Sequence, residues 1–164
     1  KGVAMQTNDP AEILRRVNDE AVQNNESCMF ITVFLAVLNI KTGEIKFANA
    51  GHNPPLIARN NNDISFLTLE SGCALGVIEN PDFITEKVGL KQGDSILLYT
   101  DGVTEAFDKN GEEFSEDRLK NEFVSIANLT AEQIVSEVIG KVSLFSNGFP
   151  QSDDITVLAL RYKL

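Results

Sequence analysis

The sequence predicts a single α+β domain in which a largely antiparallel sheet is combined with helices. The chain has 164 residues, of which 43% are hydrophobic, and this is enough for one hydrophobic core. Short β-branched and aromatic runs follow one another with turn residues between them, which is typical of antiparallel strands. Two other stretches place apolar residues at helical spacing after a capping signal. Runs of strands with separate helices are the pattern of an α+β fold.

The first predicted helix begins at Pro10. Asp9 is a suitable N-cap, proline is favoured at the first helical position, and Glu12 completes a capping box. Apolar residues then recur at helical spacing up to the pair of asparagines at 24–25, and they are Ile13, Leu14, Val17 and Ala21. We therefore expect an amphipathic helix between Pro10 and this break.

Six runs are expected to contribute to the sheet next. They are 29–40, 45–50, 56–59, 64–69, 83–88 and 95–100. The turns between them contain Gly, Asn or Asp, residues that favour chain reversal. The first two runs are predicted as a β-hairpin, and the last two as an extension of an antiparallel meander.

A second helix and a final strand complete the predicted fold. Thr130 and Gln133 form a capping box at the start of this helix. Its apolar face consists of Ile134, Val135, Val138, Ile139, Val142 and Phe145. The segment 148–150 stops the helix, and the apolar run 155–160 is expected to form a buried strand.

Charge and composition argue against several classes of protein. The formal net charge is -10, with 24 acidic and 14 basic residues, the wrong sign for binding nucleic acid or anionic lipid. The longest apolar stretch, 29–38, is far shorter than the roughly 20 residues of a membrane helix. The chain does not open on a signal peptide, and its two cysteines form no metal-binding or disulfide pattern. We expect a cytoplasmic protein without nucleic-acid binding or membrane insertion.

Acidic residues stand next to two of the predicted strands. Asp101 and Gly102 directly follow the run 95–100, whereas Asp153 and Asp154 directly precede the run 155–160. If these two strands pair antiparallel, the end of one meets the start of the other, and the carboxylates converge at one edge of the sheet. Carboxylate oxygens are hard ligands that suit Mg²⁺ or Mn²⁺.

Two alternatives to a cation site stay open on this pattern. Asp-Gly after a strand and Ser-Asp-Asp before one are also ordinary turn sequences. Eight acidic and three basic residues lie within 101–122, and this excess of acids could equally form a solvated face.

Glu105, one helical turn beyond Asp101, could contact a metal-bound water or be a solvated helix residue. His52, the only histidine, fits the stabilisation of a turn better than catalysis.

Three motifs together resemble one known family. They are FANAGHNPP at 47–55, LYTDGVTEA at 98–106 and SDDITV at 152–157. In their order and spacing they are similar to signatures of the SpoIIE/RsbU branch of the PPM-type, or type 2C-like, serine/threonine phosphatases. The resemblance extends from about Pro10 to the C-terminus. It implies an αββα sandwich of two antiparallel sheets flanked by helices.

The resemblance also implies an activity and a metal centre. Members of the family hydrolyse phosphoserine or phosphothreonine in proteins through a water that two Mn²⁺ or Mg²⁺ ions activate. By position, Asp101 and Asp153 would be metal ligands, and no side chain beyond that water would be catalytic. Gly102, Asp154 and Glu105 are further candidates for the metal shell or its surroundings. Asp154 replaces Asp153 if the motif is shifted by one residue.

The sequence departs from the family at its start. A Gly-Asp-x-x-Asp strand, which supplies a bridging Asp in similar phosphatases, is absent from residues 1–164. We therefore expect one N-terminally truncated phosphatase domain that lacks its first strands, and a homodimer that covers the exposed sheet edges.

The family also suggests partners for such a domain. The expected substrate is a phosphorylated anti-anti-sigma-factor-like protein of bacterial signalling. The expected neighbour in the parent chain is an N-terminal sensor or receiver domain. The alternative hypothesis is a catalytically silent interaction domain of the same fold, since the upstream acids are missing.

Overall fold

The computed structural model describes residues 7–23, 25, 27–60, 63–70 and 72–163. The chain divides into two compact units, which are described separately. The first unit comprises Lys1–His52 and Thr68–Leu90, and the second comprises Asn53–Leu67 and Lys91–Leu164. Within the described ranges, no helix is both long and apolar enough to cross a membrane.

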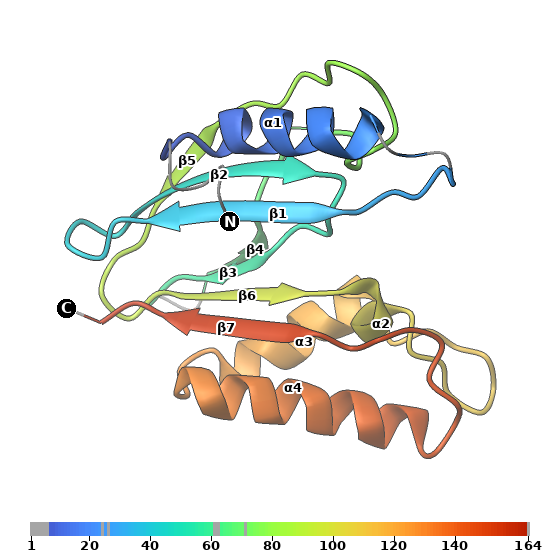
Figure 1. Cartoon of the computed structure of the whole chain (residues 1–164). Coiled ribbons are helices and arrows are strands. Elements are labelled where there is room, and N and C mark those ends of the chain that lie inside the picture. The colour runs from blue at the N-terminus through green and yellow to red at the C-terminus, as the bar shows by residue number, and fades with distance from the viewer. Residues whose placement is uncertain (1–6, 24, 26, 61–62, 71, 164) are drawn as a thin grey trace. The chain divides into compact units, whose positions relative to one another are not determined.

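The first unit is a three-stranded antiparallel sheet with one helix packed on it. The strands β1 (Val33–Leu38), β2 (Glu44–Ala50) and β5 (Glu86–Gly89) lie in the order β1-β2-β5. Figure 1 shows α1 (Pro10–Gln23) running along β1 and β2, against which it packs. The helix begins at Pro10 as expected, and the Asp9 side chain accepts a hydrogen bond from the Ala11 amide at 3.2 Å. The predicted capping box is not formed, because the Asp9 amide donates to the Thr7 hydroxyl and the Glu12 carboxylate pairs with Arg15 and Arg16 instead. The hydrophobic core of the first unit contains Ala11, Leu14, Ala48, Ala50, Leu75 and Phe83.

The second unit is a four-stranded antiparallel sheet in the order β4-β3-β6-β7. Its strands are β3 (Leu56–Ala58), β4 (Ile64–Phe66), β6 (Ser95–Tyr99) and β7 (Val157–Arg161). Strands β6 and β7 pair over their whole length, with Leu97 opposite Ala159 and Tyr99 opposite Val157. This is the antiparallel pairing on which the predicted convergence of carboxylates depends.

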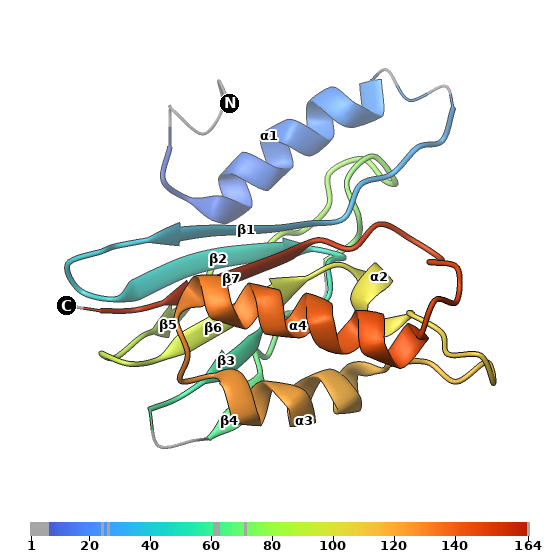
Figure 2. The same cartoon turned by 90° about the horizontal axis from the view of Figure 1, so that it is seen from below.

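Three helices belong to the second unit. The short α2 (Asp101–Thr104) follows β6 directly, and α3 (Glu116–Ile126) and α4 (Ala131–Ser146) come later. The predicted capping box of Thr130 and Gln133 is present at the start of α4. Figure 2 shows α3 and α4 lying next to each other, and the two helices are in contact.

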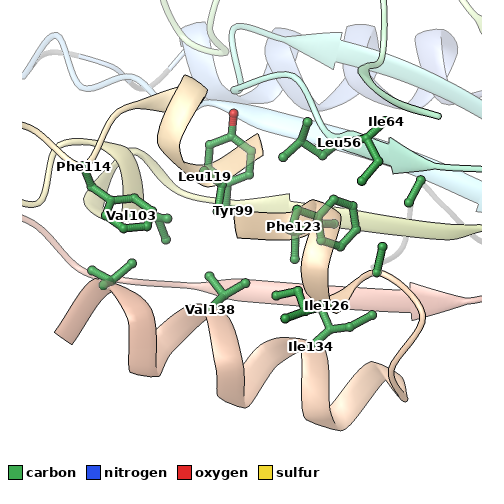
Figure 3. Packing of buried hydrophobic residues seen from close by; sticks show 14 of the residues in the cluster. Leu56, Ile64, Tyr99, Val103, Phe114, Leu119, Phe123, Ile126, Ile134 and Val138 are labelled. Carbon is green, nitrogen blue, oxygen red and sulfur yellow. The ribbon is translucent and has the colours of Figure 1, made fainter. Parts of the chain in front are cut away.

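The core of the second unit is formed by side chains from its sheet and all three helices. Phe123 of α3 and Ile134 of α4 are fully buried between the helices and the sheet, as Figure 3 shows. Val103 of α2 is also fully buried in this core, beside Tyr99 and Phe114. The anchoring of Val103 fixes α2, and with it the position of Asp101, on the end of β6.

The prediction of an α+β fold with two antiparallel sheets and helices is confirmed, but three details differ. The runs 83–88 and 95–100 do not pair, because β5 pairs with β2 and β6 pairs with β3 and β7. The final strand is an edge strand with Leu158 54% exposed, not a buried one. Helix α3 occupies a stretch for which the sequence predicted only an acidic face or a cation site. In each case the long-range partner decides what the local pattern leaves open.

Candidate metal centre

Asp101 stands at the junction of β6 and α2. Tyr99 ends the strand, Thr100 is the N-cap with extended backbone angles, and Asp101 is the first residue of the helix. The Asp101 carbonyl accepts a hydrogen bond from the Glu105 amide at 2.8 Å, which closes the single helical turn. The side chain is exposed, whereas the next three residues of α2 are buried. The strand and the buried helix therefore present one carboxylate to solvent at a fixed place.

The segment before β7 is bound to this junction through Thr100. The Thr100 amide donates to the carbonyl of Thr156 at 3.1 Å, which continues the ladder of β6 and β7 by one residue. The Thr100 hydroxyl donates to the carbonyl of Asp154 and accepts from the amide of Thr156, both at 2.9 Å. The predicted convergence of the two acidic motifs is thus present in the backbone.

Two further contacts bring the motifs together. A Cβ atom built on Gly102 would lie 2.6 Å from the carbonyl oxygen of Asp154 and 2.9 Å from that of Asp153, so the two backbones touch. The hydroxyl of Ser152 donates to the carbonyl of Glu105 at 2.9 Å. Figure 1 shows the start of β7 beside α2, where these contacts occur.

The carboxylates on the two segments are available to a cation. Asp101 accepts a hydrogen bond from the Gly102 amide at 3.0 Å through one oxygen, and Asp153 accepts one from the Asp154 amide at 2.7 Å. Asp101, Asp153 and Asp154 are all exposed. These hard oxygen donors fit Mn²⁺ or Mg²⁺. Among the described residues, however, no three His, Cys, Asp or Glu side chains are grouped closely enough to hold an ion by themselves.

A hollow of about 470 Å³ adjoins Asp101. It is lined by Asn53, Asp101, Thr104, Glu105, Glu113, Ser115, Glu116 and Asp117. Five of these residues are acidic and none is basic, so the hollow carries a negative potential that favours cations. Glu105 lies on this wall together with Asp101, whereas Asp153 and Asp154 are not among its lining residues.

A tight loop after α2 brings Glu113 and Glu116 back toward Asp101. The amides of Phe114 and Ser115 donate to the carbonyls of Ala106 and Thr104, both at 2.8 Å. At the loop tip, the amide of Glu112 donates to the Asp108 carboxylate at 2.9 Å, and this hydrogen bond is the main reason that the pKa of Asp108 is lowered. The loop places Glu113 and Glu116 on the same hollow as Asp101.

Behind the hollow, Tyr99 contributes a neutral hydroxyl. Burial raises the pKa of this phenol, and the Glu116 carboxylate, 3.4 Å from the hydroxyl, raises it further. Tyr99 is 2% exposed and is held in the core of the second unit. It therefore supports Glu116 on the wall as a hydrogen-bond donor and adds no charge of its own.

Sequence reasoning found the acids but missed the residues that join them. Thr100 and Ser152 stand inside the two acidic motifs, but the hydrogen bonds of their hydroxyls to distant backbone groups appear only in three dimensions. Glu113, Glu116 and Asp117 belonged to the acidic run noted in 101–122, but no periodicity placed them beside Asp101.

His52 lies in the first unit and forms part of a turn, as the sequence favoured. Its amide donates to the Asn49 side chain, and the Asn49 amide group donates to the His52 carbonyl, both at 3.1 Å. These reciprocal bonds close the end of β2.

Comparison with known proteins identifies the family. The family model described as stage II sporulation protein E (SpoIIE) matches residues 1–163. Protein IcfG of Synechocystis sp. is 33% identical over 150 residues, which are 90% of this chain and 23% of that protein. Phosphoserine phosphatase RsbU of Bacillus subtilis is 32% identical over 158 residues, 94% of this chain and 46% of that protein. The chain therefore spans less than half of either relative.

A solved structure gives the same answer for the fold. The SiaA-PP2C domain of Pseudomonas aeruginosa superposes with a TM-score of 0.81 at 21% identity, over 98% of this chain and 63% of that one. At this identity the likeness establishes a PP2C-type phosphatase fold and nothing finer. With the match of the family model over residues 1–163, it follows that the chain belongs to the SpoIIE family, in the SpoIIE/RsbU branch of the PPM-type phosphatases.

Proposed function

We propose that this chain is part of a metal-dependent protein phosphatase that hydrolyses phosphoserine or phosphothreonine on a regulatory protein. The observation that carries the proposal is the contact between the segment of Asp101 and the segment of Asp153 and Asp154, which is made through Thr100 and Gly102. Asp101 and Asp153 are the proposed ligands of Mn²⁺ or Mg²⁺, two of which are expected in an intact domain. Asp154 and Glu105 are the proposed neighbours of that metal shell.

The charge of the site supports a role for the cation. The side chains around the hollow would repel a phosphate dianion, because five of them are acidic. Divalent ions held by Asp101 and Asp153 would supply a water of lowered pKa and would screen the charge of the phosphoryl oxygens. The protein's own contribution is then to hold the carboxylates in place and to leave the site open to a protein substrate, since Asp101 and Asp153 are exposed.

The relatives suggest the kind of substrate and the setting. RsbU is described as a phosphoserine phosphatase, and another solved relative contains RsbU and RsbW domains in one chain. By this similarity we propose an anti-anti-sigma-factor-like phosphoprotein as substrate, in a cytoplasmic signalling pathway. We also propose a sensor or receiver domain elsewhere in the parent chain and a homodimer as the assembled state.

A Mn²⁺ titration by calorimetry tests the metal centre, with Asp101→Asn and Asp153→Asn measured beside the unmodified chain. Both substitutions should weaken binding at least tenfold, because each removes the charge of a direct ligand. Glu137→Asn, an exposed acid on α4, is the control and should bind Mn²⁺ as the unmodified chain does. Binding that neither Asp variant weakens would refute the assignment.

Hydrolysis is tested separately on a serine-phosphorylated protein of this signalling class, with release of phosphate followed in Mn²⁺. Activity that is lost in Asp101→Asn supports the proposal. A chain that binds Mn²⁺ through both Asp residues and releases no phosphate supports the second candidate, a silent interaction domain of the same fold. That candidate is favoured by one observation, since the described residues group no third ligand with Asp101 and Asp153.

A further inference from the structure

The geometry points to Thr100 as the residue that positions the two carboxylate segments for a shared cation; this inference rests on the proposed function. Its hydroxyl joins two backbone groups of the opposite segment, since it donates to the carbonyl of Asp154 and accepts from the amide of Thr156. Thr100 precedes Asp101 directly, so one side chain links the first proposed ligand to the segment that carries the second.

The hydroxyl is needed because the regular strand pairing ends at this point. Strands β6 and β7 pair as far as Tyr99 and Val157, and one more backbone bond joins Thr100 to Thr156. The residues before Thr156, 152–155, lie outside the ladder, so the carbonyl of Asp154 has no strand partner on β6. A side-chain donor replaces the missing backbone donor, and the same oxygen accepts the Thr156 amide, whose hydrogen bond would otherwise be lost.

Two neighbouring contacts limit the ways in which this connection can shift. The close approach of Gly102 to the carbonyls of Asp153 and Asp154 prevents the segments from moving nearer to each other. The bond from Ser152 to the carbonyl of Glu105 ties the segment to the far end of α2. The Gly102 contact limits how near the two segments can come, and the Ser152 hydrogen bond limits how far they can separate. Between these limits, the hydrogen bonds of Thr100 set the distance between the Asp101 and Asp153 backbones.

This role is that of a positioning residue, because Thr100 acts on the proposed ligands through the backbone. Removal of a group that orients metal ligands typically lowers metal affinity about 10 to 100-fold. Thr100→Val keeps the β-branched shape and removes the hydroxyl, whereas Thr100→Ser keeps the hydroxyl. We therefore expect Thr100→Val to bind Mn²⁺ at least 10 times more weakly than the unmodified chain, and Thr100→Ser to bind nearly as tightly.

The experiment combines calorimetry with nuclear magnetic resonance on the full chain. Mn²⁺ broadens the signals of nearby amides, so in the unmodified chain the amides of Gly102 and Asp154 should broaden over the same range of added Mn²⁺. In Thr100→Val both amides should broaden only at higher concentrations of added Mn²⁺, because the ion is bound more weakly. Thr156→Val, the same change at an exposed side chain of the opposite segment, should behave as the unmodified chain.

The outcomes separate the two proposals. Mn²⁺ binding that depends on Asp101 and Asp153 but is unchanged in Thr100→Val would overturn the positioning role alone. A chain that binds no Mn²⁺ at millimolar concentration would overturn the proposed metal centre and the positioning role with it. If Thr100→Val does not fold, as judged by circular dichroism, Thr100→Ala replaces it, since it removes the hydroxyl without adding a second methyl group.

Discussion

Gly102→Ala gives a sharp test of the contact between the two acidic segments. The new Cβ atom would lie 2.6 Å from the carbonyl oxygen of Asp154, while ordinary contacts begin near 3.4 Å. The backbones of α2 and of the segment 152–156 must therefore separate by about 0.8 Å. Such a shift changes the distance between the Asp101 and Asp153 backbones directly.

The cost of this substitution follows from the rigidity of both backbones. Val103 anchors α2 in the core, and Thr100 ties the opposite segment to β6, so neither can yield freely. Overpacking of this kind costs about 1 to 3 kcal/mol, and the gain in helix propensity from Gly to Ala recovers less than 1 kcal/mol. We expect a net loss of about 1 kcal/mol, which corresponds to a fall in Tm of roughly 3 °C for a chain of this size.

The assay is thermal unfolding followed by circular dichroism, together with Mn²⁺ calorimetry. Gly140→Ala is the matched control, because nothing lies within 4 Å of the Cβ position at this exposed residue of α4. It should leave Mn²⁺ binding unchanged and raise Tm slightly. If Gly102→Ala melts as the unmodified chain does and binds Mn²⁺ equally well, the close contact between the segments is refuted.

Three predictions on stability can be checked by thermal unfolding as well. Asp94→Ala should cost about 3 kcal/mol at neutral pH, because it removes a buried carboxylate that accepts hydrogen bonds from two backbone amides and from Arg59. Burial by itself raises the pKa of Asp94, but the Lys91 amide and the Arg59 guanidinium outweigh it and leave the pKa below 3.8. The stabilisation is therefore complete above about pH 4 and is lost as the pH falls through the lowered pKa. In a series from pH 7 to pH 2, the difference in the free energy of unfolding between Asp94→Ala and the unmodified chain should shrink only at the acidic end. A difference that stays constant over the series would contradict this. Phe123→Ala should cost about 3 to 5 kcal/mol, because the ring is fully buried between α3 and the sheet, and a cost below 1 kcal/mol would argue against that packing. Thr130→Ala should cost about 1 kcal/mol through loss of the capping box of α4, with recovery in Thr130→Ser.

The sequence was most informative where local rules and tertiary structure agree. The start of α1 at Pro10 and the capping box of α4 depend on a few adjacent residues, and both are present as expected. Strand pairing depends on distant partners, which no local pattern specifies. The local sequence at 91–94 therefore favours a hairpin turn, but the strands on its two sides belong to different sheets. Before the turn, the Leu90 amide donates to the Gly43 carbonyl, and within it the Gly93 amide donates to the Tyr162 carbonyl.

The candidate site was predictable for a related reason. A carboxylate after one strand and a carboxylate before another converge whenever those strands are antiparallel neighbours, and β6 and β7 are such neighbours. The pairing of these two strands was the only long-range fact required. Thr100 and Ser152 were out of reach, because a hydroxyl that bonds to a distant backbone leaves no trace in spacing or charge.

The arrangement of charge links the fold to the proposed chemistry. An edge that places exposed Asp101, Asp153 and Asp154 on touching segments concentrates like charge, and the acids around the adjoining hollow add to it. Without a cation this repulsion opposes the contact that Thr100 and Gly102 maintain. A divalent ion would reverse the sign of the interaction, so that the same carboxylates would hold the segments together and a phosphorylated side chain could approach. The contacts of Thr100 and Gly102 and the cation therefore act on the same distance, which is the one between the Asp101 segment and the Asp153 segment. This explains why the Thr100 hydroxyl, which contacts neither proposed ligand side chain, should control metal affinity.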